Sequence, residues 1–136
     1  MFSDANIEEI SNRVKAYGLD DIIYLVKGLF ENTLKKLNDE KFSLVFLDCN
    51  VYNSAKFAIN FAYTRLTPDG IFISHCYGIN KDSNSLWGES VAVDEYLSSK
   101  PERIVIDSIP FFQKGNNIPK IKNKQPKDKF SNYYKP

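Results

Sequence analysis

The sequence contains no Gly-x-Gly motif, because its six glycines are scattered along 136 residues. These residues therefore carry no glycine-rich turn of the kind that cradles a nucleotide cofactor. Two cysteines are too few for a disulfide scaffold, and no signal peptide or long apolar span is recognisable. These absences favour a cytoplasmic protein with reduced thiols.

Charge is nearly balanced over the whole chain but not along it. The net charge of +1 indicates neither a nucleic acid nor a membrane as a partner. Residues 114–136 contain seven Lys and one Asp, so the rest of the chain carries −5. This tail is also rich in Pro and Asn, which is typical of a solvated, flexible extension; an arm that binds phosphates or a membrane surface is the alternative. We therefore divide the chain into a domain over residues 1–113 and a basic, flexible tail over residues 114–136.

Two short apolar runs have the length and composition of buried strands. Residues 44–47 read Leu-Val-Phe-Leu, and residues 71–73 read Ile-Phe-Ile. Polar side chains that can bind metals follow closely: Asp48 after the first run, and His75 and Cys76 after the second. Each run therefore predicts a strand that ends at a candidate site.

The segment between these runs predicts a helix and a turn. Residues 53–66 place Phe57, Phe61 and Ala62 at helical spacing, and residues 67–70 read Thr-Pro-Asp-Gly. Strand, helix, turn and strand make a βαβ unit, in which the two strands run parallel. Parallel strands end at the same edge of the sheet, so the polar residues after both strands are expected to form one site.

Four segments carry a family resemblance. Residues 47–54 read LDCNVYNS, residues 65–78 read RLTPDGIFISHCYG, residues 25–34 read LVKGLFENTL, and Gly88 precedes AVDEY at residues 92–96. In order and spacing they resemble the LDGDxYxS, xLxPGGxVIIDDYG, xxKGxFxDTL and GxxxAVDEF motifs of the macrocin (TylF-type) O-methyltransferases. The resemblance covers roughly residues 6–114. It implies a class I fold that uses S-adenosylmethionine (SAM) to methylate a sugar or a small hydroxylated metabolite.

The resemblance also implies roles for single residues, and this sequence differs from the family motifs at the positions that bind the metal and supply the base. In the family, Asp residues that bind a divalent metal stand at the positions of Asp48, His75 and Cys76, and the proposed base is an Asp at the position of Asn50. An amide cannot accept a proton, so Asn50 could position the acceptor hydroxyl and His75 is the remaining candidate base. Nitrogen and sulfur suit zinc or similar ions better than magnesium, so we expect either a soft-metal site or a decayed one.

Two residues are implied as cofactor contacts. Gly28 matches the family glycine near the adenine, and Asp48 ends a strand at the cofactor side of the sheet. Each has a structural alternative: Gly28 could form an ordinary turn, and Asp48 could cap the helix that follows it.

The resemblance predicts an α/β fold with a partial, Rossmann-like class I methyltransferase sheet. A helix over residues 7–17, with Asn6 as its cap, precedes residues 22–26, which match the third strand; the first two strands and most of the SAM site are not represented. Because such sheets have the order 3-2-1-4-5-7-6, the strand at residues 44–47 becomes an apolar edge. We expect residues 22–26 to pair with that edge, to pair with another chain, or to stay poorly ordered.

Three functions follow from these expectations. The first is a SAM-dependent O-methyltransferase in truncated form, with a small-molecule acceptor and a complementing N-terminal half or a homo-oligomer as partner. The second is a non-catalytic assembly or binding module, and the third is a decayed gene product. Whether this chain is an enzyme on its own stays open at this point.

Overall fold

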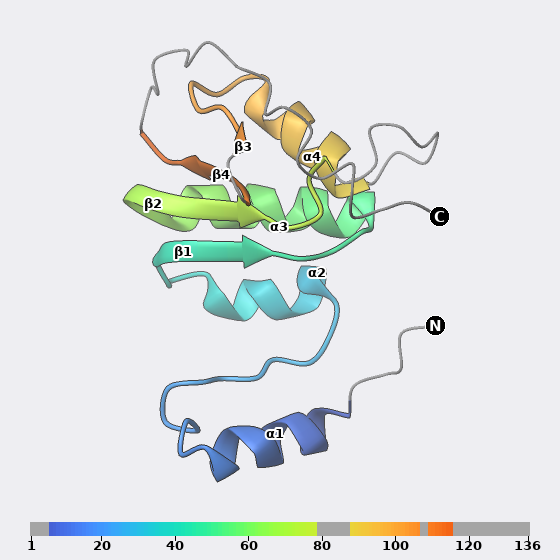
Figure 1. Cartoon of the computed structure of the whole chain (residues 1–136), viewed down its shortest axis with the longest axis vertical. Coiled ribbons are helices and arrows are strands. Elements are labelled where there is room, and N and C mark those ends of the chain that lie inside the picture. Colours follow the sequence, from blue (N-terminus) through green and yellow to red (C-terminus); the bar gives the residue numbers. More distant parts are fainter. Residues whose placement is uncertain (1–5, 79–87, 107–108, 116–136) are drawn as a thin grey trace, which may run out of the picture.

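The computed structural model describes residues 6–78, 88–106 and 109–115 (Figure 1). The elements in chain order are α1 (Ile7–Ala16), α2 (Phe30–Thr33), the 3-10 helix η1 (Leu34–Leu37), β1 (Phe42–Leu47), α3 (Tyr52–Arg65), β2 (Leu66–Ser74), α4 (Gly88–Leu97), β3 (Val105–Ile106) and β4 (Pro110–Gln113). None of the helices in these ranges is long and apolar enough to cross a membrane.

The described strands form one sheet in the order β1-β2-β4-β3. β1 and β2 run parallel, whereas β4 is antiparallel to both of its neighbours. This arrangement confirms the expected partial sheet, because it reproduces the 4-5-7-6 end of the 3-2-1-4-5-7-6 order. It also places β1 at an edge, as the sequence predicted.

The βαβ unit is confirmed, with a different boundary at its second strand. α3 connects β1 to β2, and Leu47 lies opposite Ser74 in the ladder. The predicted turn at residues 67–70 falls inside the bounds of β2, where the register with β1 shifts. Asp69 has a φ of 61°, so this part of the strand keeps the backbone of a turn.

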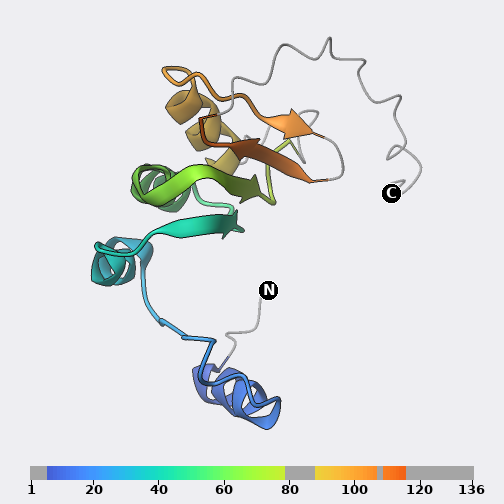
Figure 2. The same ribbon diagram turned by 90° about the vertical axis from the view of Figure 1, so that its left-hand side faces the viewer.

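One face of the sheet holds the core. Figure 2 shows α3 and α4 on the same side of the sheet. Phe72 and Phe112 are fully buried and stack with ring centroids 5.0 Å apart, and Ile59 and Val93 from the two helices complete this layer. Burying such side chains provides the main driving force for folding of this unit.

The opposite face of the sheet is apolar and open in the described part of the chain. Leu44 and Phe46 of β1 are 56% and 52% exposed, and Ile71, the ladder partner of Leu44, is also exposed. Side chains alternate between faces along a strand, so these residues point away from the helices that cover Val45 and Phe72. No described helix covers this face (Figure 2).

The N-terminal segment stands apart from the sheet. Asn6 caps α1 by accepting a hydrogen bond from the Glu8 amide, but α1 has no buried residue. Residues 22–26 are exposed and belong to no described strand, so the expected pairing of this segment with β1 within the chain is wrong, whereas its pairing with another chain stays a prediction. A strand needs a neighbour to satisfy its backbone groups, and this segment has none in the described chain.

Candidate active site at the ends of β1 and β2

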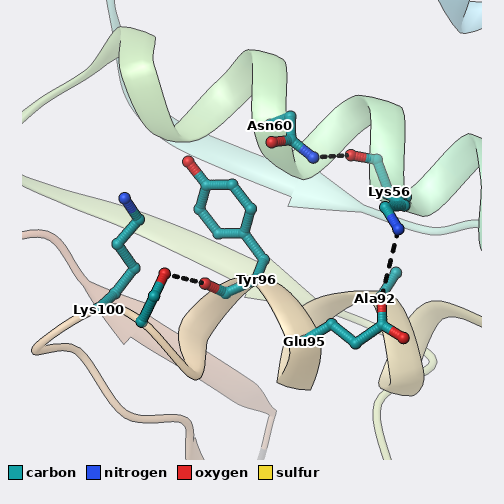
Figure 3. Close-up of a pocket in the computed structure, with 7 residues that line it drawn as sticks. Lys56, Asn60, Ala92, Glu95, Tyr96 and Lys100 are labelled. Carbon is teal, nitrogen blue, oxygen red and sulfur yellow. Dashed lines mark hydrogen bonds and ion pairs between the residues drawn. The ribbon is translucent and has the colours of Figure 1, made fainter.

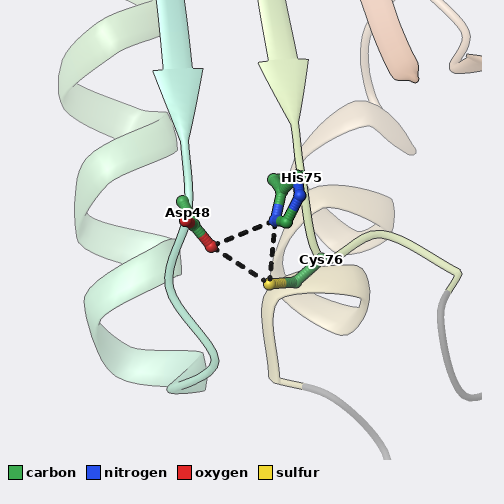
Figure 4. Close-up of side chains that lie close together, drawn as sticks. All are labelled: Asp48, His75 and Cys76. Carbon is green, nitrogen blue, oxygen red and sulfur yellow. Dashed lines mark hydrogen bonds and ion pairs between the residues drawn. The ribbon is translucent and has the colours of Figure 1, made fainter. Parts of the chain in front are cut away.

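Three side chains meet where β1 and β2 end, as Figure 4 shows. Asp48 directly follows β1, and His75 and Cys76 directly follow β2. The Asp48 Oδ1 atom lies 3.2 Å from His75 Nδ1 and 3.4 Å from Cys76 Sγ, and the latter two atoms are 3.9 Å apart. The structure therefore brings together the three residues that the sequence singled out as metal ligands.

Two neighbouring residues can share this site because β2 has already ended at Ser74. Inside a strand, His75 and Cys76 would point to opposite faces. Here residues 75–78 form a turn, and the His75 amide donates to the Leu47 carbonyl at 2.9 Å. The turn therefore aims both side chains toward Asp48.

The site is open on one side and closed on the other. Asp48 and His75 are exposed, while Cys76 is buried. Burial, together with the hydrogen bond to Asp48, raises the pKa of the Cys76 thiol to about 12. Burial also raises the pKa of the neighbouring Cys49 thiol to about 11. Without a bound cation, both sulfurs are protonated thiols.

Sequence reasoning missed Glu89, a fully buried carboxylate behind the site. Its Oε1 accepts hydrogen bonds from Ser74 Oγ at 2.5 Å and the Cys76 amide at 3.1 Å, and its Oε2 accepts one from the Cys49 amide at 2.9 Å. One side chain on α4 thus connects, by hydrogen bonds, the segments that directly follow β1 and β2. We call it the Glu89 clamp. A Glu in the first turn of a helix is ordinarily exposed, so nothing in the local sequence indicated this burial.

Gly88 explains how α4 brings Glu89 so close. A Cβ atom at this glycine would lie 2.2 Å from the backbone nitrogen of Tyr52 at the start of α3. No real side chain tolerates that distance, so the starts of α3 and α4 are in backbone contact only because this residue is Gly. This contact gives a physical reason for the glycine in the segment that carried the resemblance.

Asp48 does not cap the following helix. The N-cap of α3 is Val51, and no side chain caps its first turn. The structural alternative for Asp48 is therefore wrong, and its carboxylate faces the site instead. Asn50 lies exposed two residues beyond Asp48.

Gly28 lies just before α2, in a conformation that suits glycine. Its φ is +142°, and a Cβ there would lie 2.8 Å from the Thr33 side chain. The local turn is therefore sufficient to account for this glycine.

A separate groove lies between α3 and α4 (Figure 3). It is lined by Lys56, Asn60, Ala92, Glu95, Tyr96, Ser99 and Lys100. Lys56 pairs with Glu95 at 3.4 Å across it, and Tyr52 donates a hydrogen bond to the same carboxylate. These charged groups satisfy one another and do not converge on the strand ends.

The sequence matches the family model described as macrocin-O-methyltransferase (TylF) over residues 3–109. The chain belongs to this family. The macrocin O-methyltransferase match covers the whole candidate site, including both strand ends and Glu89. Among proteins of curated function, none matches the sequence significantly.

Solved structures with the same fold include two O-methyltransferases, NovP and CalS11. The O-methyltransferase NovP superposes with a TM-score of 0.66 at 22% identity, over 78% of this TylF-family chain and 43% of its own. The apo form of CalS11, a TDP-rhamnose 3'-O-methyltransferase of calicheamicin biosynthesis, superposes with a TM-score of 0.61 at 15% identity, over 85% of this chain and 56% of its own. This chain therefore spans about half the length of the solved structures it resembles.

The side chains present do not fit the magnesium ion that the family resemblance implies. Magnesium requires oxygen ligands in near-octahedral geometry. This macrocin O-methyltransferase family member offers one carboxylate, one imidazole and one thiol at the corresponding positions. Only the oxygen of Asp48 is a good ligand for magnesium, so no step of the reaction is derived through that ion.

The cofactor site is also incomplete in these residues. The sequence has no Gly-x-Gly turn, and the described sheet begins at the strand that ends in Asp48. The described part of the chain thus offers Asp48 and, at a distance in the sequence, Gly28 as candidate SAM contacts. These residues do not make up a whole binding site for that molecule.

Proposed function

We propose that this chain supplies the acceptor side of a SAM-dependent O-methyltransferase that acts on a sugar or small hydroxylated metabolite. The observation that carries the proposal is the meeting of Asp48, His75 and Cys76 at the ends of parallel strands in a TylF-family fold. The carboxyl edge of a parallel sheet is where such folds bind ligands. SAM would supply the methyl group; everything else below concerns the residues of this chain.

The proposed roles follow from side-chain chemistry. Asp48 Oδ1 lies 3.2 Å from His75 Nδ1, so the carboxylate can hold the imidazole with its other nitrogen, Nε2, free to receive the acceptor proton. Asn50 is exposed two residues after Asp48 and is proposed to donate a hydrogen bond to the acceptor oxygen, because its amide cannot take the proton. His75 is thus the proposed catalytic residue, with Asn50 as a proposed contact of the acceptor.

The cofactor side is proposed to come from a second polypeptide segment with the first two strands of the fold. Gly28 and Asp48 would be the contacts that this chain adds. The solved neighbours are about twice as long as the matched region. β1 is an edge strand of the described sheet, and its Leu44 and Phe46 side chains are exposed. An unpaired apolar edge favours the addition of another strand.

The proposed occupant of this edge is a complementing N-terminal half rather than a second copy. Residues 22–26 are exposed and lie outside every described strand, and in the proposed complex they would become the strand beyond the added ones. A second copy would cover the edge of β1 but would leave this segment without a neighbour on both sides. Self-association through β1 is the outcome that would contradict the choice.

A non-catalytic assembly module is the second candidate function. The observation that favours it is Asn50, which stands at the position of the family base and cannot act as one. The exposed apolar face of β1 and β2 would serve such a module equally well.

The two functions are distinguished by complementation. The full chain would be mixed with the N-terminal half of an intact TylF-family enzyme, and methyl transfer from radiolabelled SAM to TDP-sugar acceptors would be measured. Transfer that is lost in His75→Ala supports the enzyme. A stable complex without transfer supports the assembly module.

The same preparation tests the cofactor proposal. By itself the chain is expected to bind SAM weakly, because each missing charge-assisted hydrogen bond removes roughly 1.5–3 kcal/mol of interaction. Calorimetric titration that showed micromolar binding to the isolated chain would contradict a divided cofactor site. A cytoplasmic location is part of the proposal, and the two free thiols, Cys49 and Cys76, support it because a reducing compartment keeps thiols reduced.

A further inference from the structure

We propose that Asp48, His75 and Cys76 form a binding site for a thiophilic divalent cation of the zinc class. The inference concerns the site of the proposed methyl transfer, but it does not require that transfer to occur. It replaces the magnesium ion of the family resemblance by an ion that matches the ligands actually present. Carboxylate, imidazole and thiolate are together the ligand types that zinc accepts.

The spacing of the three ligand atoms matches a tetrahedral ion. Zinc bond lengths of 2.0–2.3 Å to O, N and S place neighbouring ligands about 3.3–3.6 Å apart in a tetrahedron. The observed separations are 3.2 Å for Asp48 Oδ1 to His75 Nδ1, 3.4 Å for Asp48 Oδ1 to Cys76 Sγ, and 3.9 Å for His75 Nδ1 to Cys76 Sγ. A shift of a few tenths of an ångström in one side chain would complete the match.

The backbone already holds these ligands in place. The Glu89 clamp accepts from the amides of Cys49, next to Asp48, and of Cys76 itself. The ring of Phe46 lies 5.6 Å from the His75 imidazole, which limits the movement of that ring. Groups outside the ligand set that fix ligand orientation are a general feature of metal sites in proteins.

The surroundings also suit a cation that arrives from solvent. Asp48 and His75 are exposed, whereas Cys76 forms the buried floor (Figure 4). The ion would meet the carboxylate and imidazole first and would release the thiol proton to solvent as sulfur binds. Three protein ligands leave one position free, as in catalytic rather than structural zinc sites.

Metal binding would change what His75 can do. In the metal-free pair, Nδ1 faces Asp48 and Nε2 is free to accept a proton. When Nδ1 binds a cation, the ring proton resides on Nε2, which can then no longer act as a base. The metal-bound cluster and the Asp48–His75 pair are therefore two exclusive states of one site.

Cobalt spectroscopy of the full-length chain tests the proposal directly. Co²⁺ would be added to chelator-treated protein, and absorbance would be followed in the near ultraviolet for thiolate-to-cobalt charge transfer and in the visible for tetrahedral cobalt. We expect saturation at one ion per chain, displacement by Zn²⁺, and no displacement by a hundredfold excess of Mg²⁺. Absence of the charge-transfer band, or displacement by Mg²⁺, would overturn the proposal.

The chain offers a matched control, because it has one His and two Cys. Cys76→Ser should abolish the charge-transfer band, and His75→Ala should weaken cobalt binding by about 100-fold or more. Cys49→Ser should leave both the band and the affinity unchanged, with circular dichroism confirming that each variant is folded. A band that survives in Cys76→Ser, or disappears in Cys49→Ser, would show that the cluster is not the site. Because no measurement involves SAM or an acceptor, this outcome is separate from the fate of the proposed methyl transfer.

Discussion

The unit from β1 to β4 and the segment over residues 6–29 differ in how far their apolar side chains are buried. In the first, side chains such as Ile59, Phe72 and Phe112 are fully buried, and a charged group, Glu89, is buried with all its hydrogen bonds made. In the second, apolar side chains such as Tyr24 are exposed, and α1 buries nothing. Burial in this chain is therefore confined to the sheet and the helices packed on it, while the apolar side chains of the N-terminal segment stay half-buried or exposed in the described chain.

The largest expected difference between the regions is in stability. Phe72→Ala removes a buried ring that stacks on Phe112, and we expect a loss of roughly 3–5 kcal/mol in the free energy of unfolding. Tyr24→Ala, in the exposed segment, is expected to change it by less than about 0.5 kcal/mol. Urea unfolding followed by circular dichroism measures both. Equal losses would show that the N-terminal segment is part of the folded core.

The second expected effect sharpens the role of the Glu89 clamp. Glu89→Gln keeps the size of the side chain but directs an NH₂ group at hydrogen-bond donors, and we expect to lose about 1.5–3 kcal/mol of stability. Affinity for cobalt should fall about 10–100-fold, because the clamp positions two of the ligands. Glu95→Gln, an exposed position on the same helix, is the control and should leave cobalt affinity unchanged. A Glu89→Gln variant with normal cobalt affinity would remove the clamp from the site.

A third prediction concerns the open edge. Leu44→Lys places a charge on the exposed face of β1 and should weaken association with a complementing N-terminal half by at least about tenfold. Because Leu44 is more than half exposed, stability of the chain alone should change little. Ser98→Lys adds the same charge at an exposed position on the helical side. Analytical ultracentrifugation compares the two; equal affinities would mean that β1 is not the contact.

The smallest expected effect is a pH dependence at the far end of the sheet. Burial by itself raises the pKa of the Glu102 carboxyl. The net effect is nevertheless a pKa below the ordinary value, because the carboxylate accepts hydrogen bonds from the backbone amides of Gly115 and Glu102 and from the Tyr63 hydroxyl, and because Lys100 is positively charged. The folded state therefore binds this proton less tightly than the unfolded state. Its stabilisation is present above the ordinary Glu pKa, near about 4.3, and is lost as pH falls through the lowered value.

Unfolding free energies measured at several acidic pH values test this linkage. Glu102→Gln should make the acid dependence shallower, whereas exposed Glu8→Gln should not. Tyr63, which donates a hydrogen bond to Glu102, gives the opposite pH dependence at high pH. Burial and this hydrogen bond raise the pKa of Tyr63 to about 12. The free energy of unfolding should therefore fall as the pH rises from about 10 to 12. An unchanged acid limb in Glu102→Gln would contradict this assignment.

The strands β1 and β2 and the site at their ends could be predicted from the sequence, because the apolar runs mark the strands and the polar residues directly follow them. Short apolar runs at residues 44–47 and 71–73 predict buried strands, and parallel pairing then requires Asp48 and His75 to share an edge. A strand at residues 22–26 was expected from the family resemblance, and the described chain does not pair this segment with β1. A strand depends on a neighbour, and the local sequence contains no information on whether that neighbour belongs to the same chain.

Other features of the site depend on contacts between distant residues. Nothing in a first-turn Glu distinguishes Glu89 from an exposed residue, because its burial results from the crossing of α4 over the start of α3. Similarly, the start of β2 was misplaced because Asp69 adopts a turn backbone while its amide still donates to the Lys114 carbonyl and Leu66 and Ile71 pair with β1. The spacing of apolar residues along the sequence does not indicate such contacts between distant residues.

Gly88 sets both the distance between the starts of α3 and α4 and the position of the buried Glu89 carboxylate. Any side chain there would lift the start of α4 away from Tyr52 and carry the adjacent Glu89 carboxylate out of reach of the strand ends. A search for other proteins with this site should therefore require the dipeptide Gly-Glu at the start of the helix that follows the His-Cys pair. Chains that keep the three ligands but lack this dipeptide would be expected to hold them too loosely to bind a cation.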